Sequence, residues 1–300
     1  MNVLITSATG YIGSAVTRAL QSHGHQVVGI ARSAASAKKL ELLGVHPHRG
    51  DLNDVNSLYK AAQQADAVIH TAATNDFDMA MVDQLAVKAL LAALARSQKP
   101  FVYTSGIWVM GNTGELLADE TLSVNPPQIV AWRPAIEDLV LAAAANGVRS
   151  VVIRPALVYG HGGGLLAMLT KAGYDQRAVP VIGMGNNFWS LVHVDDLATL
   201  YVKAVEQAPA GTLLIGASGE SVPFQKLALA AAEVAGVGVK LQHITLETAH
   251  QIWGDLADAM VLNQQVSGDR AKRLLNWTPI APSALTELTK GSYRQMAIPA

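Results

Sequence analysis

The most constraining feature of the sequence is the run TSATGYIG at residues 6–13, which follows an apolar stretch at residues 3–5 and opens a helical pattern. A strand, a glycine-containing turn and a helix start together form a cradle for a pyrophosphate, because backbone N–H groups and the positive end of the helix dipole face the anion. Gly10 is expected to let the backbone approach the phosphates, and Gly13 to let the helix pack closely on the strand. Ser7 stands where a first glycine is usual, so an ordinary tight turn remains the alternative.

A basic residue follows the second expected strand, residues 26–31. Arg32 lies roughly 20 residues beyond the glycine turn, the offset at which such folds place the group that reads the adenosine ribose. A carboxylate there accepts from a free 2′-hydroxyl, whereas an arginine pairs with a 2′-phosphate. Arg32, with Ser33 beside it and Lys38 and Lys39 nearby, therefore favours NADP, with NAD as the second possibility. A solvated basic helix start is the alternative interpretation.

A third signal is GDLND at residues 50–54. Asp51, followed by Leu52, is expected at the end of a strand, where its carboxylate could accept from the adenine amino group. The same carboxylate could instead cap a helix over residues 53–63.

Composition narrows the classes of function. The chain has 300 residues, half of them hydrophobic, which suits one large α/β domain with an elaboration, or two domains. The formal net charge is −1, so the charge of the chain does not indicate a nucleic acid or an anionic membrane as a partner. No cysteine is present and the nine histidines are scattered, so we expect no metal site. We see no signal peptide and no apolar run of roughly 20 residues, and expect a cytoplasmic protein.

Short apolar runs alternate with alanine- and leucine-rich helical stretches. The expected strands are residues 2–6, 26–31, 67–70, 100–104 and 150–154, and the expected helices are residues 12–23, 54–64, 79–97 and 134–146. This alternation predicts an α/β fold with a doubly wound parallel sheet and ligands at the carboxyl ends of its strands. Later residues predict a helix at 195–207, a strand at 212–215 and a helix at 223–235, in a smaller lobe that closes over the cofactor.

Several motifs occur together: TSATGYIG, Arg32, GDLND, VIHTAA at 68–73, VYTSG at 102–106, RPALVYG at 154–160 and LVHVDDLA at 191–198. With them the chain resembles the extended short-chain dehydrogenase/reductases, which include nucleotide-sugar epimerases and dehydratases. The resemblance implies a Rossmann sheet of about seven strands over residues 1–160, to which residues 188–207 return. It also implies a substrate lobe within residues 161–300 and a homodimer through the helices at 79–97 and 134–146.

The resemblance also implies which residues hold the nicotinamide dinucleotide. These are Thr6, Ser7, Thr9, Gly10, Tyr11, Ile12, Gly13, Arg32, Ser33, Asp51, Leu52, Thr71, Ala72, Ala73, Arg133, Pro155 and Val158.

The catalytic pair of the family is missing. Its members use a tyrosine that exchanges the proton and a lysine four residues later that lowers the tyrosine pKa and holds the ribose. None of the seven tyrosines has a lysine four positions later. No tyrosine lies between Tyr103 and Tyr159, and no lysine between Lys99 and Lys171, so no alignment restores the pair.

Other residues occupy the catalytic positions. Alignment places Ile129 at the tyrosine and Arg133 at the lysine position, and Gly106 at the usual serine, with Ser105 adjacent. Proline is comfortable only in the first helical turn, so Pro134 predicts that this helix begins near Arg133.

The candidate catalytic residues are Ser105, Arg133, Tyr159 and His161. Arg133 could hold the ribose or a phosphate, but a guanidinium does not give up a proton near neutral pH. Tyr159 fits either a packing role or the site, and His161, in a glycine-rich loop, has a side chain suited to proton exchange.

The sequence favours an NADP-dependent reductase of a small carbonyl or related compound, working by hydride transfer without the usual pair. A non-catalytic NADP(H)-binding sensor and a sugar-nucleotide epimerase or dehydratase are the alternatives.

Overall fold

The computed structural model describes residues 1–74, 78–219 and 221–296. Its large sheet has seven strands in the order β10-β6-β5-β4-β1-β2-β3, all parallel. The strands are β1 (Asn2–Ile5), β2 (Gln26–Ala31), β3 (His46–Arg49), β4 (Ala67–His70), β5 (Pro100–Thr104), β6 (Arg149–Pro155) and β10 (Thr212–Gly216). The doubly wound parallel sheet predicted from the sequence is confirmed.

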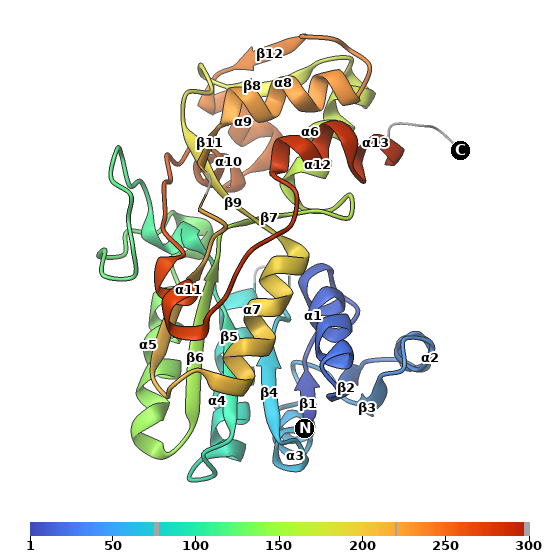
Figure 1. Cartoon of the computed structure of the whole chain (residues 1–300), viewed down its shortest axis with the longest axis vertical. Helices are drawn as coiled ribbons and strands as arrows, with labels where there is room; N and C mark the ends of the chain where they lie inside the picture. Colours follow the sequence, from blue (N-terminus) through green and yellow to red (C-terminus); the bar gives the residue numbers. More distant parts are fainter. Residues whose placement is uncertain (75–77, 220, 297–300) are drawn as a thin grey trace.

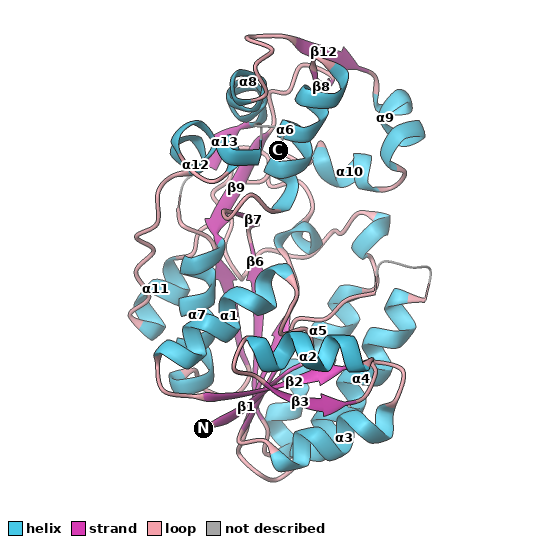
Figure 2. Cartoon of the chain, turned by 90° about the vertical axis from the view of Figure 1, so that its right-hand side faces the viewer, coloured by secondary structure: helices cyan, strands magenta, loops and turns pink. Residues whose placement is uncertain are grey.

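Helices cover both faces of this sheet (Figures 1 and 2). One face carries α1 (Tyr11–Ser22), α7 (Val194–Gln207) and α11 (Asp269–Leu275), and the other α3 (Val55–Gln64), α4 (Met79–Leu94) and α5 (Arg133–Ala142). The alternation of strand side chains explains both cores, because Val3 and Ile5 pack with the first set of helices and Leu4 with the second. All three side chains are fully buried.

The structure departs from the expected elements in places. The helix predicted to end at residue 97 ends at Leu94, and the one predicted over 134–146 continues beyond α5 as a 3₁₀ turn, Ala143–Asn146. A strand that ends near Asp51 was expected without bounds and is β3, whereas α2 (Ala34–Leu42) was not predicted. β3 has the sequence HPHR and lies at the sheet edge, where β2 is its one partner strand. None of its four residues is fully buried, so it needs no apolar pattern.

An upper lobe lies above the carboxyl ends of the large sheet's strands (Figure 1). It contains a three-stranded sheet in the order β11-β9-β7, a parallel pair β12-β8, and a core of its own. The strands are β7 (Leu157–Tyr159), β8 (Val179–Ile182), β9 (Phe188–His193), β11 (Ser221–Pro223) and β12 (Leu241–Ile244). The helices are α6 (Gly164–Gln176), α8 (Phe224–Val234), α9 (Leu246–Trp253), α10 (Leu256–Met260), α12 (Ala284–Lys290) and α13 (Tyr293–Met296).

The chain returns to the large sheet beyond residue 207. β10 pairs with β6 as the last strand of that sheet, and α11 packs on its face. The domain division expected from the sequence assigned only residues 188–207 of the second half to the large sheet, so it omitted β10 and α11.

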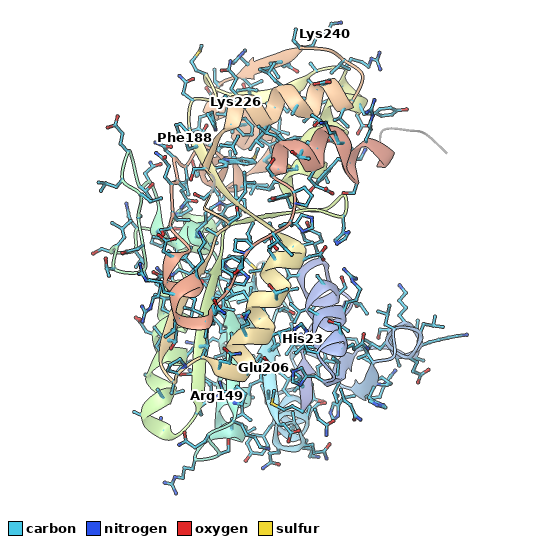
Figure 3. All side chains as sticks on the ribbon, in the orientation of Figure 1. His23, Arg149, Phe188, Glu206, Lys226 and Lys240 are labelled. Atoms are coloured by element: carbon cyan, nitrogen blue, oxygen red, sulfur yellow. The ribbon has the colours of Figure 1, made fainter. Side chains whose placement is uncertain are left out.

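An arginine fixes this return. Arg149, at the start of β6 and labelled in Figure 3, donates to the carbonyl oxygens of Ala208 at 3.0 Å and Ala204 at 3.4 Å, and also to that of Val205. These carbonyls belong to the last turn and C-cap of α7, whose unpaired oxygens favour a cation.

None of the helices within the described ranges is long and apolar enough to cross a membrane.

Candidate active site

The glycine turn closes tightly between β1 and α1. A Cβ on Gly13 would lie 1.8 Å from the carbonyl oxygen of Ser7, and one on Gly10 would lie 2.6 Å from Ser7 Oγ. Position 13 therefore admits no side chain, because α1 packs directly on the turn. Gly10 is the N-cap of α1 and leaves the first N–H groups of the helix without a side-chain cap.

A cavity of about 450 Å³ lies on one side of this turn, at the carboxyl ends of β1, β2 and β4. Its lining contains eight of the residues expected to hold the cofactor: Thr6, Ser7, Thr9, Arg32, Asp51, Leu52, Ala72 and Ala73. The sequence did not single out the other four: Ile30, Ser36, Asn53 and Thr74. The arrangement offers a polar recess with one guanidinium and one carboxylate.

The two carboxylates of GDLND have different roles. Asp54, not Asp51, is the N-cap of α3, and its Oδ1 accepts from the backbone N–H of Ser57 at 3.0 Å. Asp51 Oδ1 accepts from the backbone N–H of Asn53 at 2.9 Å, in a turn that faces the cavity. The capping alternative for Asp51 is therefore wrong.

Ser33 is used locally. Its hydroxyl accepts from the backbone N–H of Ser36, and the Ser36 hydroxyl accepts in return from the backbone N–H of Ser33. This capping box starts α2 directly after Arg32. Ser33 thus orients the helix that follows Arg32, and it does not line the cavity.

A buried polar network holds the strand ends behind this cavity. The Thr6 hydroxyl accepts from the backbone N–H groups of Thr71 and Ala72 at 3.2 and 3.1 Å, and lies 3.0 Å from His70 Nδ1. His70 Nε2 lies 2.9 Å from Asp83 Oδ1. Since a carboxylate only accepts, Nε2 carries the proton and the Thr6 hydroxyl donates to Nδ1. His70 therefore has a structural role.

A second cavity, of about 630 Å³, lies on the other side of the glycine turn. Five of its lining residues were expected at the site: Tyr11, Ile12, Ser105, Pro155 and Val158. The others are Gly106, Ile107, Trp108, Ala156, Leu157, Gly164 and Leu165. Ser105 is 8% exposed, and its Oγ has no hydrogen-bond partner among the described residues. A largely apolar recess is thus lined by one residue whose buried hydroxyl has no partner among the described residues.

Arg133 lies at the end of β5. It begins α5 with Pro134 in the first turn, as predicted, and Nη1 donates to the carbonyl oxygen of Thr104 at 2.9 Å. The guanidinium also stacks on Trp132, 4.7 Å from the ring centre. Ile129, at the family's tyrosine position, falls in a 3₁₀ turn, Gln128–Val130, before the helix. Arg133 is thereby fixed beside the residue that precedes Ser105.

Two candidate catalytic residues lie away from the second cavity. Tyr159 is 2% exposed in the core of the upper lobe, and its hydroxyl donates to the carbonyl oxygen of Pro282 at 2.7 Å. The side chain of His161 is 51% exposed, and its Nε2 lies 2.8 Å from the Asp195 carboxylate. Neither residue lines the cavity, so this geometry favours a packing role for Tyr159 and a surface ion pair for His161.

The loop that contains His161 still contributes to the site through its backbone. The Tyr11 hydroxyl donates to the carbonyl oxygen of Gly160 at 2.8 Å. Tyr293 accepts from the backbone N–H of Gly160 at 2.8 Å and donates to the carbonyl oxygen of Gly163 at 2.7 Å. These bonds join the start of α1 to the upper lobe.

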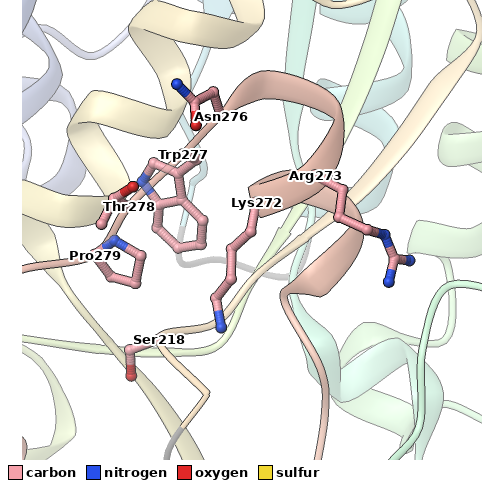
Figure 4. Close-up of a pocket in the computed structure, with 7 residues that line it drawn as sticks. All are labelled: Ser218, Lys272, Arg273, Asn276, Trp277, Thr278 and Pro279. Atoms are coloured by element: carbon pink, nitrogen blue, oxygen red, sulfur yellow. The ribbon is translucent and has the colours of Figure 1, made fainter.

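A further cavity, of about 470 Å³, lies beside α11 and is shown in Figure 4. Lys272, on its wall, pairs with Asp269 at 3.3 Å, and the indole N–H of the buried Trp277 donates to the carbonyl oxygen of Asp196. None of the dinucleotide motif residues lines it.

In the described part of the chain, no group of three or more His, Cys, Asp or Glu side chains could hold a metal ion.

Comparison with known proteins decides the family. The model of the NAD-dependent epimerase/dehydratase family matches residues 3–216. The chain belongs to this family. An uncharacterised protein of Schizosaccharomyces pombe is 31% identical, over 98% of this chain and 100% of its own length. The 2-alkyl-3-oxoalkanoate reductase of Stenotrophomonas maltophilia is 28% identical, over 84% of this chain and 81% of its own length.

A solved structure of the family shares the fold. The UDP-glucose 4-epimerase of Thermotoga maritima superposes with a TM-score of 0.82, at 20% identity and over 99% of both chains. The family and the curated relatives make this chain an enzyme of the NAD(P)-dependent oxidoreductase type.

Proposed function

We propose that this enzyme uses NADPH to reduce a small carbonyl or related compound by hydride transfer, without a tyrosine–lysine pair. The observation that carries the proposal is the second cavity: an apolar recess next to the glycine turn, with the unpartnered Ser105 hydroxyl in its wall. The similarity to the 2-alkyl-3-oxoalkanoate reductase of Stenotrophomonas maltophilia supports the same class of reaction.

The residues around the turn fit a nicotinamide dinucleotide. Only glycine fits at position 13, and the hydroxyls of Thr71 and Thr74 are buried with no partner in the described structure, so both are open to a ligand. We propose that the residues of the first cavity hold the adenosine half and that Tyr11, Ile12, Pro155 and Val158 flank the nicotinamide half. The bound cofactor would supply the hydride.

NADP is proposed over NAD because of Arg32. It is exposed and lines the first cavity at the position that reads the ribose. Two parallel N–H groups of a guanidinium match a phosphate, whereas a ribose hydroxyl is better matched by a carboxylate.

Ser105 and Arg133 have different proposed roles. The Ser105 hydroxyl donates a hydrogen bond to the substrate oxygen. Arg133, fixed by the Thr104 carbonyl, holds the nicotinamide ribose or a phosphate where the family has its lysine. Tyr159 and His161 have no part in the proposal, because their side chains are engaged elsewhere.

Titration of the two cofactors tests the proposal. Arg32→Ala should weaken NADPH binding by about 10- to 100-fold, the value of a charge-assisted contact, and leave NADH binding nearly unchanged. Lys39→Ala is the matched control, because Lys39 is an exposed cation of α2 outside the cavity lining. Equal losses for both cofactors would remove Arg32 from phosphate recognition. NADPH binding without turnover of any carbonyl compound would favour the sensor alternative.

A further inference from the structure

Among the described residues that line the second cavity, none has a side chain that could serve as an acid near neutral pH. Its described lining residues include no carboxylate, ammonium, guanidinium or imidazole. The lining residues with a polar side-chain group are Tyr11 and Ser105, each with a hydroxyl, and Trp108, with its indole N–H. Each is neutral, so the wall offers hydrogen bonds but no charge.

The Tyr11 hydroxyl is not available as a proton donor. It donates to the carbonyl oxygen of Gly160 at 2.8 Å. Burial, and secondarily the neighbouring Tyr293, raise the pKa of Tyr11 well above its usual value. The group therefore keeps its proton, and Ser105 is left as a hydrogen-bond donor without acidity.

This wall restricts which carbonyl compounds can be reduced. Hydride addition to an isolated ketone leaves an alkoxide, and an enzyme normally protonates it from a positioned acid in the transition state. Hydride addition to the β-carbon of a quinone or of an unsaturated ketone leaves an enolate. The quinone-derived enolate takes up one proton and becomes an aromatic hydroquinone by moving a ring proton to oxygen. A phenol has a pKa of about 10, so water can protonate these delocalised anions afterwards.

We propose that the substrate is an uncharged, conjugated carbonyl compound, of which a quinone is the type, bound with its oxygen on Ser105. The inference rests on the proposed function above and specifies its substrate. The reduced nicotinamide gives a hydride, which forms one new bond to the acceptor. The electron pair of the opened π bond moves to the carbonyl oxygen, water supplies the one proton that completes the product, and the cofactor is left oxidised.

The apolar lining and its lack of charge support this class of substrate. Ile107, Trp108, Leu157 and Leu165 give the recess apolar walls, which suit a planar hydrocarbon ring. A diphosphate ester would need cations for its charge, and no lysine or arginine is found among the lining residues that the structure describes.

Binding can be measured without turnover. Trp108 lies in the wall, so 2-methyl-1,4-naphthoquinone should quench its fluorescence saturably in the protein with or without NADP⁺. Trp108→Phe should remove this quenching, which separates it from that of the other tryptophans. Ser105→Ala should weaken the binding about tenfold, the value of one neutral hydrogen bond, and Ser105→Thr should retain it. Unchanged NADPH affinity in Ser105→Ala would show that the variant is folded.

Turnover then distinguishes the two levels of the proposal. With NADPH, the naphthoquinone and 2-cyclohexen-1-one should be reduced at least about 100-fold faster than cyclohexanone. The rate should be flat between about pH 6 and pH 9, since none of the described lining residues is an acid that titrates in this range. If NADPH binds and cyclohexanone is reduced as fast, the inference fails and the proposed function stands. A pH inflection that disappears in His161→Gln would also overturn the inference, and absence of NADPH binding would overturn the proposed function itself.

Discussion

Replacing Glu137 by glutamine tests how the large sheet holds α5. Glu137 of α5 and Arg154 of β6 form an ion pair with side chains only 3% and 5% exposed. Arg154 Nε lies 3.0 and 3.2 Å from the two carboxylate oxygens, and Nη2 lies 2.5 Å from Oε2. The buried Nη1 atom has no partner within the described chain, so the guanidinium depends on this one carboxylate.

The expected loss of stability follows from these contacts. Glutamine keeps one accepting oxygen near Nε, but its NH₂ group then faces the Nη2 donor. The loss of that charge-assisted bond costs about 1.5–3 kcal/mol, and the guanidinium is left without a counter-charge. Breaking a buried ion pair costs about 3–5 kcal/mol, and we expect about 4 kcal/mol for Glu137→Gln. With a urea slope of about 3 kcal/mol per molar, the midpoint should fall by about 1.3 M.

Urea denaturation followed by circular dichroism measures this change. The double variant Glu137→Leu/Arg154→Met is the matched comparison, because apolar side chains of similar volume remove both charges at once. It should recover most of the stability that Glu137→Gln loses. A loss below about 1 kcal/mol in the single variant, or a double variant no more stable than the single one, would refute this account of the pair.

Two further predictions concern α4. Burial raises the pKa of the Asp83 carboxyl, but hydrogen bonds from His70 and Tyr103 outweigh it and hold the pKa below its usual value. The ionised carboxylate therefore stabilises the fold above about pH 4, and this stabilisation is lost as pH falls through the pKa of the folded state. Asp83→Asn should lower the free energy of unfolding by about 2–3 kcal/mol at pH 7 and by clearly less at pH 3. If the variant loses the same free energy of unfolding at pH 3 as at pH 7, the carboxylate does not have this lowered pKa. Met81 and Leu85, 56% and 45% exposed on the outer face of α4, favour the expected homodimer, so light scattering should show a dimer that Leu85→Glu dissociates. A monomeric wild type at micromolar concentration would remove that interface.

The fold could be predicted where the pattern is local. β2, β4 and β5 begin and end at the predicted residues, because each is an apolar run between polar turns. β10 was predicted as a strand, but its pairing with β6 was not, since nothing in a short apolar run identifies its neighbour. The bounds of β3 could not be predicted, because this edge strand has no fully buried side chain and therefore no apolar pattern.

The site was predictable in the same measure. The predicted residues make up eight of the twelve that line the first cavity and five of the twelve that line the second, since the motifs lie within a few residues of strand ends. The network of Thr6, His70 and Asp83 was not found, because it joins residues up to 77 positions apart, from β1 to α4. The His161–Asp195 pair was also missed, because it depends on how the upper lobe meets α7.

The path of the chain between its two lobes constrains how such an enzyme can change. The chain leaves the large sheet after β6, returns with α7 and β10, leaves again at β11, returns with α11 and leaves a last time at α12. A hybrid protein with the upper lobe of another enzyme would need three separate replacements, at residues 157–193, 221–260 and 284–296. Both ends of each replaced segment would have to fit the packing of the lobe that is kept. Recombination at a single point would split both hydrophobic cores, so we expect new substrate preferences to arise through point substitutions in the cavity wall.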